Sequence, residues 1–523
     1  MKKVLIANRG EIAVRVIRAC REMGLSPVAV YSECDRTALH VRYADEAYPV
    51  GPSAPRESYL RIDRIIDAAR RSGADAVHPG YGFLAENENF ARAVREAGLT
   101  FIGPTSDAIA LMGSKTAARA AARRAGVPVV PGAPDDDSAI PADASDDHLL
   151  RLGDGIGFPL LVKAVSGGGG KGMRTVADRG DLVDAVSAAR SEAGTAFGDA
   201  AVYFERSLVR PRHIEVQVLG DERGTIVPFV ERECSIQRRH QKVVEETPSP
   251  AVSPALRRAL TSAAAALARS VGYTNAGTVE FLLDEDGRFY FLEMNTRLQV
   301  EHPVTEMVTG LDLVRWQIRL ARGERLDVLE RDADRLLVPN GHAIECRIYA
   351  EDPDNNFLPS PGRVLDLRAP SGPGIRNDSG IDAGLDVPIF YDPLLSKLVA
   401  WGEDRSAATA RMRRALAEYL VTGINTTVPF FTWLLDQPEF IDGRFHTTFL
   451  DEVLKARNGK PFVAPTDDLE VVAAIAAALN AVLSPASASG DRERLDVTRR
   501  WKTQARFDGL RESTSRRPAN RGG

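Results

Sequence analysis

Glu280 and Glu293 stand on two β-prone runs that flank Asp286-Gly287, a dipeptide typical of a two-residue type I′ hairpin turn. Such a turn would place Glu280 directly opposite Glu293, with Asn295 on the same face. Apolar residues occupy both faces of the hairpin, so we expect it to be buried, where facing carboxylates are unfavourable unless a cation lies between them. Carboxylate and amide oxygens suit Mg²⁺ or Mn²⁺ beside substrate phosphates. The hairpin therefore predicts a divalent-metal site; the alternative is a chance pair with one glutamate protonated or at an exposed edge.

A glycine-rich loop, Ser166-Gly-Gly-Gly-Gly-Lys-Gly172, lies between two segments with strand character. Successive glycines let backbone N–H groups close around an anion without obstruction by Cβ atoms. The loop departs from the G-x-x-x-x-G-K-[ST] pattern because Met173 follows it and no helix begins there, so we interpret it as a flap that covers phosphates. Lys163 and Lys115 would supply positive charge to the same phosphates. The alternative for an isolated glycine run is a flexible linker.

Two polar stretches carry the other candidates. Residues 293–303 continue directly from the hairpin, so Arg297, Gln299 and Glu301 should lie near the metal-bound phosphates. Basic side chains there would hold a small oxyanion by charge-assisted hydrogen bonds, and Glu301 would serve as a general base. Residues 231–246 are dense in charge with few turn residues, and a solvated charged face explains them as well as a site does.

The elements that position these residues begin with a repeated βα pattern over residues 1–112. Such repeats imply a mostly parallel sheet covered by helices. The layout is Rossmann-like, but its first turn is Asn8-Arg9-Gly10-Glu11, which disfavours a dinucleotide-binding dehydrogenase. Residues 133–147, rich in aspartate, are typical of a solvated loop, whereas residues 341–400 show β patterning with many turns.

The composition is that of a soluble globular protein with about three domains, since 523 residues are 44% hydrophobic and 27% charged. A net charge of −5 gives no strong field for nucleic acid or an anionic membrane. Four cysteines are too few for a disulfide framework or a structural zinc site. The N-terminal apolar stretch is too short for a signal peptide and residues 471–483 are too short to span a bilayer, so we expect a cytoplasmic protein.

Several segments together resemble biotin carboxylase, the ATP-grasp ligase component of the biotin-dependent carboxylases. They are KVLIANRGEIAVRVIRAC, HPGYGFLAEN, FPLLVKAVSGGGGKGM, RHIEVQVLGD, ECSIQRRHQKVVEE, EMNTRLQVEHPVTE and GHAIECRIYAED, within residues 1 to about 453. The resemblance implies a fold of α/β and α+β class in three domains. These are a Rossmann-like N-terminal domain (1–112), an ATP-grasp domain (113–335) with a mobile lid at about 131–204, and a β-rich C-terminal domain (336–453). Residues 454–523 form an extension that either docks a partner or is disordered.

The resemblance also assigns roles residue by residue. The positions that resemble ATP contacts are Lys115, Lys163, Gly169, Gly170, Glu205, Arg206, Ser207, Leu208, His213, Gln237, His240, Glu280 and Glu293. The metal ligands are matched by Glu280, Glu293 and Asn295, in agreement with the hairpin argument. The bicarbonate site is matched by Lys242, Arg297, Gln299, Val300 and Glu301, and the arginine that faces biotin by Arg347. The catalytic set would be Lys242, Arg297, Glu301 and Arg347.

The implied enzyme is a ligase that forms a C–N bond, using ATP and two Mg²⁺ or Mn²⁺ ions. Bicarbonate, held by Lys242 and Arg297 and deprotonated by Glu301, attacks the γ-phosphoryl group to give carboxyphosphate. This intermediate breaks down to CO₂ and phosphate, and the phosphate can take the N1 proton of biotin. Arg347 would stabilise the enolate-like biotin anion, and closure of the glycine lid would exclude water.

The sequence has no lysine flanked as in the Ala-Met-Lys-Met-like turn of biotin carriers, and it stops short of a carboxyltransferase domain. We therefore expect a separate subunit, commonly a homodimer in this family, that meets a biotin carboxyl carrier protein and a carboxyltransferase subunit. One competing hypothesis is another ATP-grasp ligase, in which an amine or ammonia captures an acyl phosphate. The other is a nucleotide-binding regulator without catalysis, which the presence of Lys242, Glu293 and Arg297 disfavours. The sequence does not specify the acyl-CoA or keto acid that the complete enzyme carboxylates.

Overall fold

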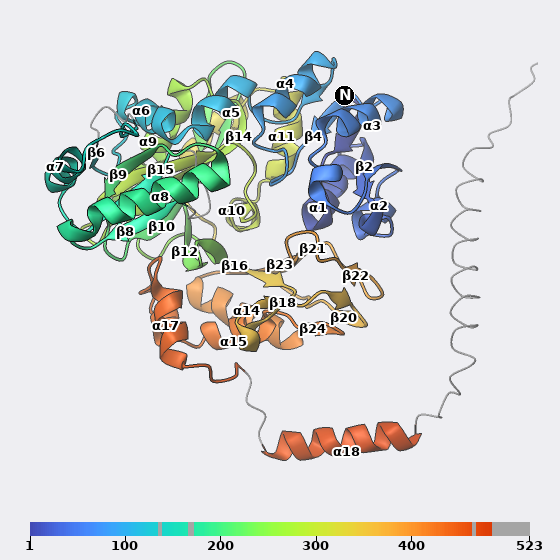
Figure 1. Ribbon diagram of the computed structural model, residues 1–523. Coiled ribbons are helices and arrows are strands. Elements are labelled where there is room, and N and C mark those ends of the chain that lie inside the picture. Colours follow the sequence, from blue (N-terminus) through green and yellow to red (C-terminus); the bar gives the residue numbers. More distant parts are fainter. Residues whose placement is uncertain (134–138, 166–171, 463–466, 484–523) are drawn as a thin grey trace, which may run out of the picture. The chain divides into compact units, whose positions relative to one another are not determined.

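The computed structural model describes residues 1–133, 139–165, 172–462 and 467–483 (Figure 1). By its internal contacts the chain divides into two compact units, Met1–Phe462 and Val463–Gly523. The smaller unit contributes one described helix, α18 (Asp467–Leu483), whose exposed apolar side chains include Val471, Val472, Ile475 and Leu479. Over the part of the chain that the structure describes, no helix is long and apolar enough to cross a membrane.

The N-terminal region is a five-stranded parallel sheet in the order β3-β2-β1-β4-β5. Its strands are β1 (Lys3–Ile6), β2 (Ser26–Ser32), β3 (Glu46–Gly51), β4 (Ala76–His78) and β5 (Thr100–Phe101). Its helices are α1 (Gly10–Glu22), α2 (Leu39–Tyr43), α3 (Ile62–Ser72), α4 (Glu88–Glu96) and α5 (Ser106–Gly113). Val4 and Ile6 pack in one buried cluster with α1, and Leu5 in another with α3, so helices cover both faces. The predicted βα repeat is confirmed.

The first turn of this sheet lies at the edge where the carboxyl ends of β1 and β4 meet. There Nδ2 of Asn8 donates hydrogen bonds to the carbonyl oxygens of Pro79 and Tyr81, each at 2.7 Å. Ligands of open α/β sheets bind at this edge, because the loops that leave neighbouring strands converge there. The loops after β1 and β4 are therefore placed to form one wall of a site.

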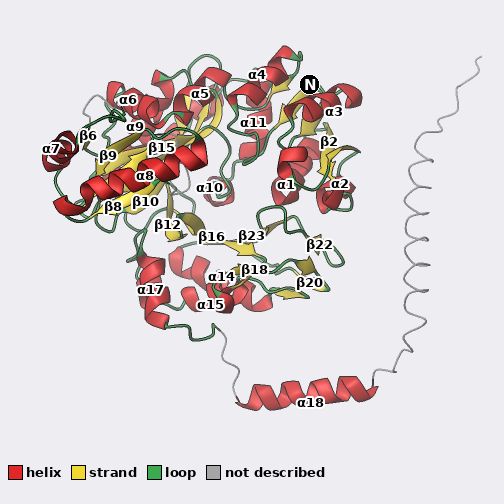
Figure 2. Cartoon of the chain, viewed as in Figure 1, coloured by secondary structure: helices red, strands yellow, loops and turns green. Residues whose placement is uncertain are grey.

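A second, four-stranded sheet has the order β6-β9-β7-β8. Its strands are β6 (Gly132–Ala133), β7 (Leu160–Ala164), β8 (Met173–Val176) and β9 (Val202–Arg206), with helices α7 (Asp146–Ile156) and α8 (Leu182–Phe197). Helix α6 (Lys115–Arg124), which precedes this sheet in the chain, packs instead against β15 (Phe289–Asn295) of a third sheet. Helix α8 packs against β7 and β8 (Figure 2). The loop prediction over residues 133–147 is wrong at its end, because the side chain of Ser145 accepts a hydrogen bond from the backbone N–H of His148 and starts α7.

The third sheet has nine strands, in the order β15-β14-β10-β12-β13-β16-β23-β21 with β11 paired to β10. These strands are β10 (Arg212–Gly220), β11 (Ile226–Pro228), β12 (Arg232–Arg238), β13 (Gln241–Thr247), β14 (Asn275–Leu283), β15 (Phe289–Asn295), β16 (His342–Tyr349), β21 (Ile375–Ser379) and β23 (Leu394–Gly402). Antiparallel pairing of β13 with β16 makes this sheet continuous across the predicted boundary at residue 335. The polar stretch 231–246 forms the hairpin β12–β13, mostly buried, so it is not a solvated charged face.

The remaining elements cover the long sheet and complete its C-terminal half. The helices are α9 (Pro254–Ser270), α10 (His302–Thr309), α11 (Leu313–Ala321), α12 (Asp327–Arg331), α13 (Ala333–Leu336), α14 (Arg405–Glu418), α15 (Val428–Leu434), α16 (Pro438–Ile441) and α17 (Phe449–Arg457). The short strands are β17 (Glu351–Asp352), β18 (Leu358–Pro359), β19 (Gly362–Arg363), β20 (Asp366–Arg368), β22 (Asp386–Val387) and β24 (Leu420–Thr422). Helix α14 packs on β16 and β23, and α10 also contacts these strands, together with β13.

Candidate active site

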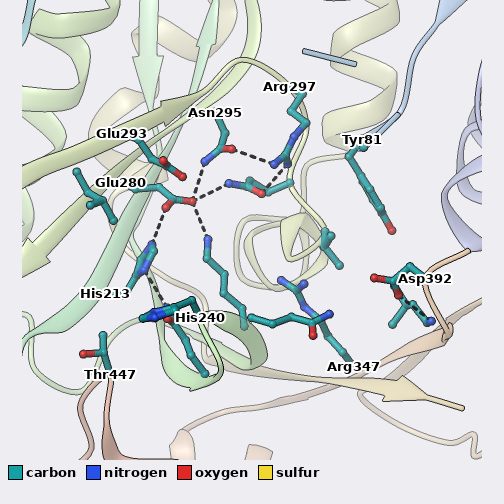
Figure 3. Close-up of a pocket in the computed structure, with 18 of the residues that line it drawn as sticks. Tyr81, His213, His240, Glu280, Glu293, Asn295, Arg297, Arg347, Asp392 and Thr447 are labelled. Carbon is teal, nitrogen blue, oxygen red and sulfur yellow. Dashed lines mark hydrogen bonds and ion pairs between the residues drawn. The ribbon is translucent and has the colours of Figure 1, made fainter. Parts of the chain in front are cut away.

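A pocket of about 930 Å³ lies between the N-terminal sheet edge, the four-stranded sheet and the nine-stranded sheet (Figure 3). The predicted site residues that line it are Lys163, Ser207, Leu208, His213, Gln237, His240, Lys242, Glu280, Glu293, Asn295, Arg297, Gln299, Val300 and Arg347. Asn8, Tyr81, Tyr391 and Asp392, which the sequence reasoning did not single out, line it as well. The predicted loop glycines Gly169 and Gly170 lie outside the described residues.

The hairpin of β14 and β15 brings the predicted carboxylate pair together, with Glu280 opposite Glu293. Towards the turn the register differs from the prediction, because a shift after Glu280 places Phe281 opposite Phe291. This bulge means that residues nearer the turn pair one position away from the predicted register. The prediction for the two glutamates is therefore confirmed, whereas the uniform register behind it is wrong.

The turn itself is also longer than predicted. A type I′ turn needs positive φ at both central residues, but only Gly287 of the predicted pair has one, at 78°. Oδ1 of Asp284 accepts hydrogen bonds from the backbone N–H groups of Asp286 at 3.0 Å and Arg288 at 2.9 Å. This side-chain turn favours a three-residue loop. The extra loop residue and the bulge are opposite offsets, and they cancel at the carboxylates.

Glu280 is contacted at both carboxylate oxygens (Figure 3). Oε1 accepts hydrogen bonds from Nζ of Lys242 at 2.7 Å, Nδ2 of Asn295 at 2.8 Å and Nε2 of Gln299 at 2.9 Å. Oε2 lies 2.8 Å from Nε2 of His213. Burial alone would raise the pKa of Glu280, but Lys242 and His213 hold that pKa well below its ordinary value. Glu280 is therefore an anion.

Glu293 faces the pocket and, within the described part of the chain, has no hydrogen-bond or ion-pair partner. The side chain of Glu293 is exposed on β15, the edge strand of its sheet, so the predicted burial holds for Glu280 but not for Glu293. The pKa of Glu293 is raised because the protein around it limits its solvation and because Glu280 lies opposite. A facing carboxylate pair with one unpartnered member, next to the amide of Asn295, is a donor set that suits a hard divalent cation. The ligating atoms of His213, Glu215 and Glu280 also lie within 4.8 Å of one another. The residues present therefore fit a magnesium or manganese ion.

Lys242 joins three buried carboxylates. Its Nζ lies 2.5 Å from Oε2 of Glu215, 2.7 Å from Oε1 of Glu280 and 2.7 Å from Oε1 of Glu301. Glu215 also pairs with the fully buried guanidinium of Arg232. Burial alone would lower the pKa of Lys242, but the three carboxylates raise that pKa well above its ordinary value. The side chain is thus a permanent ammonium group at the pocket wall.

Glu301, which contacts Lys242, also forms an ion pair with Arg347. Nη2 of Arg347 donates a hydrogen bond to Oε2 of Glu301 at 3.0 Å and lies 2.5 Å from Oε1 of Glu245. The side chain of Glu301 is fully buried just below the pocket lining. Burial alone would raise the pKa of Glu301, but Lys242 and Arg347 hold that pKa well below its ordinary value. Glu301 is available as a proton acceptor only after part of this positive charge moves away.

Arg297 is held in place by three side chains. Nε donates to Oε2 of Glu86 at 2.8 Å, Nη1 to Oε1 of Gln299 at 2.8 Å and Nη2 to Oδ1 of Asn295 at 2.9 Å. Oε1 of Glu86 also accepts a hydrogen bond from the backbone N–H of Thr296 at 3.0 Å. Glu86 lies in the loop between β4 and α4, so the N-terminal region positions this arginine. The guanidinium is pre-oriented at the pocket surface, as the recognition of a small planar anion requires.

The residues predicted to contact ATP divide into two groups. Ser207, Leu208, His213, Gln237 and His240 line the pocket, and Nε2 of Gln237 contacts Nδ1 of His213 at 2.9 Å. By contrast, the Glu205 carboxylate is turned towards Lys163, at 2.6 Å, and Arg119. The exposed side chain of Arg206 lies outside the pocket lining, as does Lys115, whose pKa is lowered by burial and by Lys163. Glu205 therefore orients Lys163.

Four charged residues that the sequence reasoning missed complete the site: Glu86, Glu215, Arg232 and Glu245. A signal for one of them was present, since His213, Glu215 and Gln217 alternate with apolar residues along β10 and so share a face. Arg232 and Glu245 stand in the charged stretch 231–246, whose density of charge was the only signal for them, and Glu86 had none. The partners of Glu86 and Glu245 are Arg297 and Arg347, which are distant in sequence.

Family models match most of the chain. The model described as "Biotin carboxylase, N-terminal domain" matches residues 1–109, and "Biotin carboxylase C-terminal domain" matches residues 345–452. Between them, "Carbamoyl-phosphate synthase L chain, ATP binding domain" matches residues 114–329. Each of the three matched segments contributes residues to the lining of the pocket.

Two relatives match this chain over nearly their whole length. The chain is 50% identical over 470 residues to a pyruvate carboxylase subunit of Methanothermobacter thermautotrophicus, covering 90% of this chain and 94% of the relative. It is 50% identical over 453 residues to a biotin carboxylase of Nostoc, covering 87% of this chain and 99% of the relative.

Solved structures give the same result. The Campylobacter jejuni biotin carboxylase–β,γ-ATP complex has a TM-score of 0.82 and 45% identity, covering 86% of this chain and 98% of that one. The biotin carboxylase domain dimer of Hydrogenobacter thermophilus 2-oxoglutarate carboxylase, in complex with MgADP, ADP and bicarbonate, has a TM-score of 0.82 and 46% identity. The match covers 89% of this chain and 99% of that domain.

Proposed function

This chain belongs to the biotin carboxylase family, and we propose that it carboxylates biotin on a separate carrier protein, using ATP and bicarbonate. It is an ATP-dependent ligase, and the bond that it forms is the C–N bond of carboxybiotin. The observation that carries the proposal is the convergence of Lys242, Arg297, Glu301 and Arg347 beside the Glu280–Glu293 pair. One pocket thus contains both the carboxylate pair that would hold metal-bound phosphates and the basic side chains that would hold a small anion.

ATP would occupy the part of the pocket nearest the four-stranded sheet. Lys163 and Lys115 would place positive charge near its phosphates. Pocket side chains would contact the nucleotide, namely Ser207, Leu208, His213, Gln237 and His240. Further contacts would come from the backbone at Glu205 and Arg206 and from the loop at Gly169 and Gly170. Glu280, Glu293 and Asn295 would hold two Mg²⁺ or Mn²⁺ ions, which neutralise phosphate charge when bound. The relatives in complex with an ATP analogue and with MgADP support this placement.

Bicarbonate would bind between Arg297 and Lys242, beside Gln299 and the backbone of Val300. Glu301 would take the proton of the bicarbonate hydroxyl, and a bicarbonate oxygen would then attack the γ-phosphorus as its bond to ADP breaks. Lys242 contacts Glu301 directly, so movement of Lys242 towards the substrate would remove a cation from Glu301 and make that carboxylate a stronger base. The products of this step are carboxyphosphate and ADP.

Biotin would enter from the side that Arg347 faces. Carboxyphosphate would split into CO₂ and phosphate, the phosphate would remove the N1 proton, and N1 would attack CO₂. The negative charge that develops on the ureido oxygen would be stabilised by Arg347, whose own pKa is raised well above its ordinary value by Glu245 and Glu301 despite burial. Arg347 thus remains charged throughout the reaction.

The direct test is ADP release by the purified chain with Mg²⁺ and bicarbonate, measured with and without free biotin. We expect turnover that requires bicarbonate and increases with biotin. Turnover without any dependence on bicarbonate would contradict the proposal. Turnover that requires bicarbonate but does not change with free biotin would be consistent with formation of carboxyphosphate. The same assay would then be repeated with a biotinylated carrier protein.

The chain would act within a larger assembly. We propose a homodimer that meets a biotin carboxyl carrier protein and a carboxyltransferase subunit, in a cytoplasmic enzyme that carboxylates an acyl-CoA or a keto acid. The Methanothermobacter relative is named as one subunit of its enzyme, and the Hydrogenobacter structure is a domain dimer, which support these two points for the present chain.

We also propose the domain boundaries 1–112, 113–335 with a lid at about 131–204, and 336–453. The extension 454–523 would dock a partner subunit. Helix α18 supports the docking role, because its exposed residues Val471, Val472, Ile475 and Leu479 offer apolar side chains along a single helix.

A further inference from the structure

Behind the pocket, two glutamates face each other on neighbouring strands. Glu245 of β13 lies directly opposite Glu345 of β16, and both side chains are fully buried. The same face of β16 carries Arg347, and β23 places Lys397 opposite that arginine. Glu245 and Glu345 are thus an opposed carboxyl pair immediately behind the arginine that faces biotin.

Two positively charged side chains lie near this pair, and each has identified partners. Arg347 lies 2.5 Å from Oε1 of Glu245 and 3.0 Å from Oε2 of Glu301. Lys397 donates to the carbonyl oxygen of Val300 at 2.9 Å and lies 3.3 Å from Oε2 of Glu11. Among the described residues, neither carboxyl oxygen of Glu345 has a hydrogen-bond or ion-pair partner, whereas the only polar contact of the Glu245 carboxylate is its ion pair with Arg347. The other titratable groups around the pair are Lys242, Tyr349, Cys346 and Cys234.

Two ionised carboxylates are unfavourable in this position. Opposed residues of an antiparallel pair have Cβ atoms about 5 Å apart, and like charges there destabilise the sheet. One proton shared by such a pair removes the repulsion. Burial raises the pKa of Glu345 well above its ordinary value, whereas the contact with Arg347 limits the corresponding rise in the pKa of Glu245, to about 7. Above pH 7 the proton therefore belongs on Glu345 and the negative charge on Glu245.

We propose that Glu245 is a positioning residue for Arg347, and that Glu345, held protonated, keeps this counter-ion singly charged. The proposal rests on the proposed function, in which Arg347 stabilises the biotin anion. Nη2 of Arg347 is shared between Glu245 and Glu301. When Glu301 receives the proton of bicarbonate it loses its charge, and Glu245 remains as the anion that holds the guanidinium in place.

Glutamine substitutions separate the two roles, because glutamine has the shape of a protonated glutamate. We expect Glu345→Gln to keep biotin-dependent ADP release within about twofold of the wild type. Glu245→Gln should raise the KM for biotin or lower kcat by about tenfold or more, since a buried charge pair loses one partner. ADP release that requires bicarbonate alone should stay within about twofold in Glu345→Gln, which shows that this variant keeps the fold and the ATP site.

A second measurement is independent of activity. At pH 8, the infrared difference spectrum between the wild type and Glu345→Gln should contain the C=O stretching band of a protonated carboxyl group. Absence of that band, equal impairment of both variants, or a normal KM and kcat for Glu245→Gln would each overturn the proposal. If Glu245→Gln does not fold, Glu245→Asp, which retracts the charge from Arg347, gives the same comparison. If the wild type shows no biotin-dependent turnover, the proposed function is contradicted. The infrared band does not depend on turnover, so it tests the protonation of Glu345 in either case.

Discussion

Replacing Lys242 by methionine removes the cation that contacts Glu215, Glu280 and Glu301, at 2.5, 2.7 and 2.7 Å. Breaking a buried ion pair costs about 3–5 kcal/mol of stability, because a charge is left without its partner. Each of the three carboxylates keeps another donor here, so we expect the lower end of that range, about 3 kcal/mol at pH 8. Bicarbonate-dependent ADP release should fall by roughly 100-fold or more, the usual cost of losing one oxyanion donor.

The deficit should depend on pH in a definite direction. Without Lys242, one carboxylate of the cluster should bind a proton in the folded state near neutral pH, so its folded-state pKa lies above the unfolded value. A group of this kind lowers stability as pH rises, and one extra bound proton corresponds to about 1.4 kcal/mol per pH unit. The stability deficit of Lys242→Met should therefore be smaller at pH 6 than at pH 8.

The assay is chemical denaturation followed by tryptophan fluorescence at both pH values, with Lys3→Met as the matched control. Lys3 pairs with Glu46 at 2.6 Å, but these side chains are 26% and 38% exposed, so its loss should cost less than about 1 kcal/mol at either pH. A Lys242→Met deficit as small as that of the control, or an equal deficit at pH 6 and pH 8, would show that Lys242 does not balance the charge of the three buried carboxylates.

Three more variants test other parts of the molecule: Arg347 at the pocket, His78 in the N-terminal sheet and the segment after Phe462. Arg347→Ala should abolish biotin carboxylation while slow bicarbonate-dependent ATP cleavage persists, measured as carboxybiotin and ADP; normal carboxybiotin output would contradict the assignment. Burial lowers the pKa of His78 from 6.5 to about 4, so the unfolded state binds more protons between these values and stability falls with decreasing pH. That one histidine should account for about 2 kcal/mol between pH 7 and pH 5, and denaturation of His78→Gln should show a shallower pH dependence than the wild type. Ending the chain after Phe462 should leave ADP release intact but weaken co-purification with the other subunits, and unchanged assembly would remove the docking role.

The sequence was most informative where local patterns determine structure. Alternation of β and helical segments predicted the N-terminal parallel sheet, and the two glutamates of the β14–β15 hairpin were predicted to be opposite each other. The details of that hairpin could not be predicted, because the side chain of Asp284 selects a longer loop and a bulge after Glu280 compensates for it. The correct pairing of Glu280 with Glu293 thus depends on two departures from the simplest hairpin.

The charged network around Lys242 and Arg347 depends on long-range pairing. The sequence of residues 231–246 fits a solvated surface as well as a site, and only the pairing of β13 with β16, about a hundred positions away, shows that part of the stretch is buried. Glu245 contacts Arg347 and Glu86 contacts Arg297 only because separate regions meet at one pocket. Hydrophobic periodicity of two residues for strands or 3.6 residues for helices does not predict such contacts between residues that are distant in the sequence.

The fate of the bicarbonate carbon shows whether the chain carboxylates biotin. The purified chain, supplied with ATP, Mg²⁺, ¹³C-labelled bicarbonate and biotin, free or on a carrier protein, should produce biotin with a labelled carboxyl group, seen by mass spectrometry. The labelled product should require ATP and should disappear in Arg347→Ala. ATP consumption that requires bicarbonate but leaves both forms of biotin unlabelled would contradict the account.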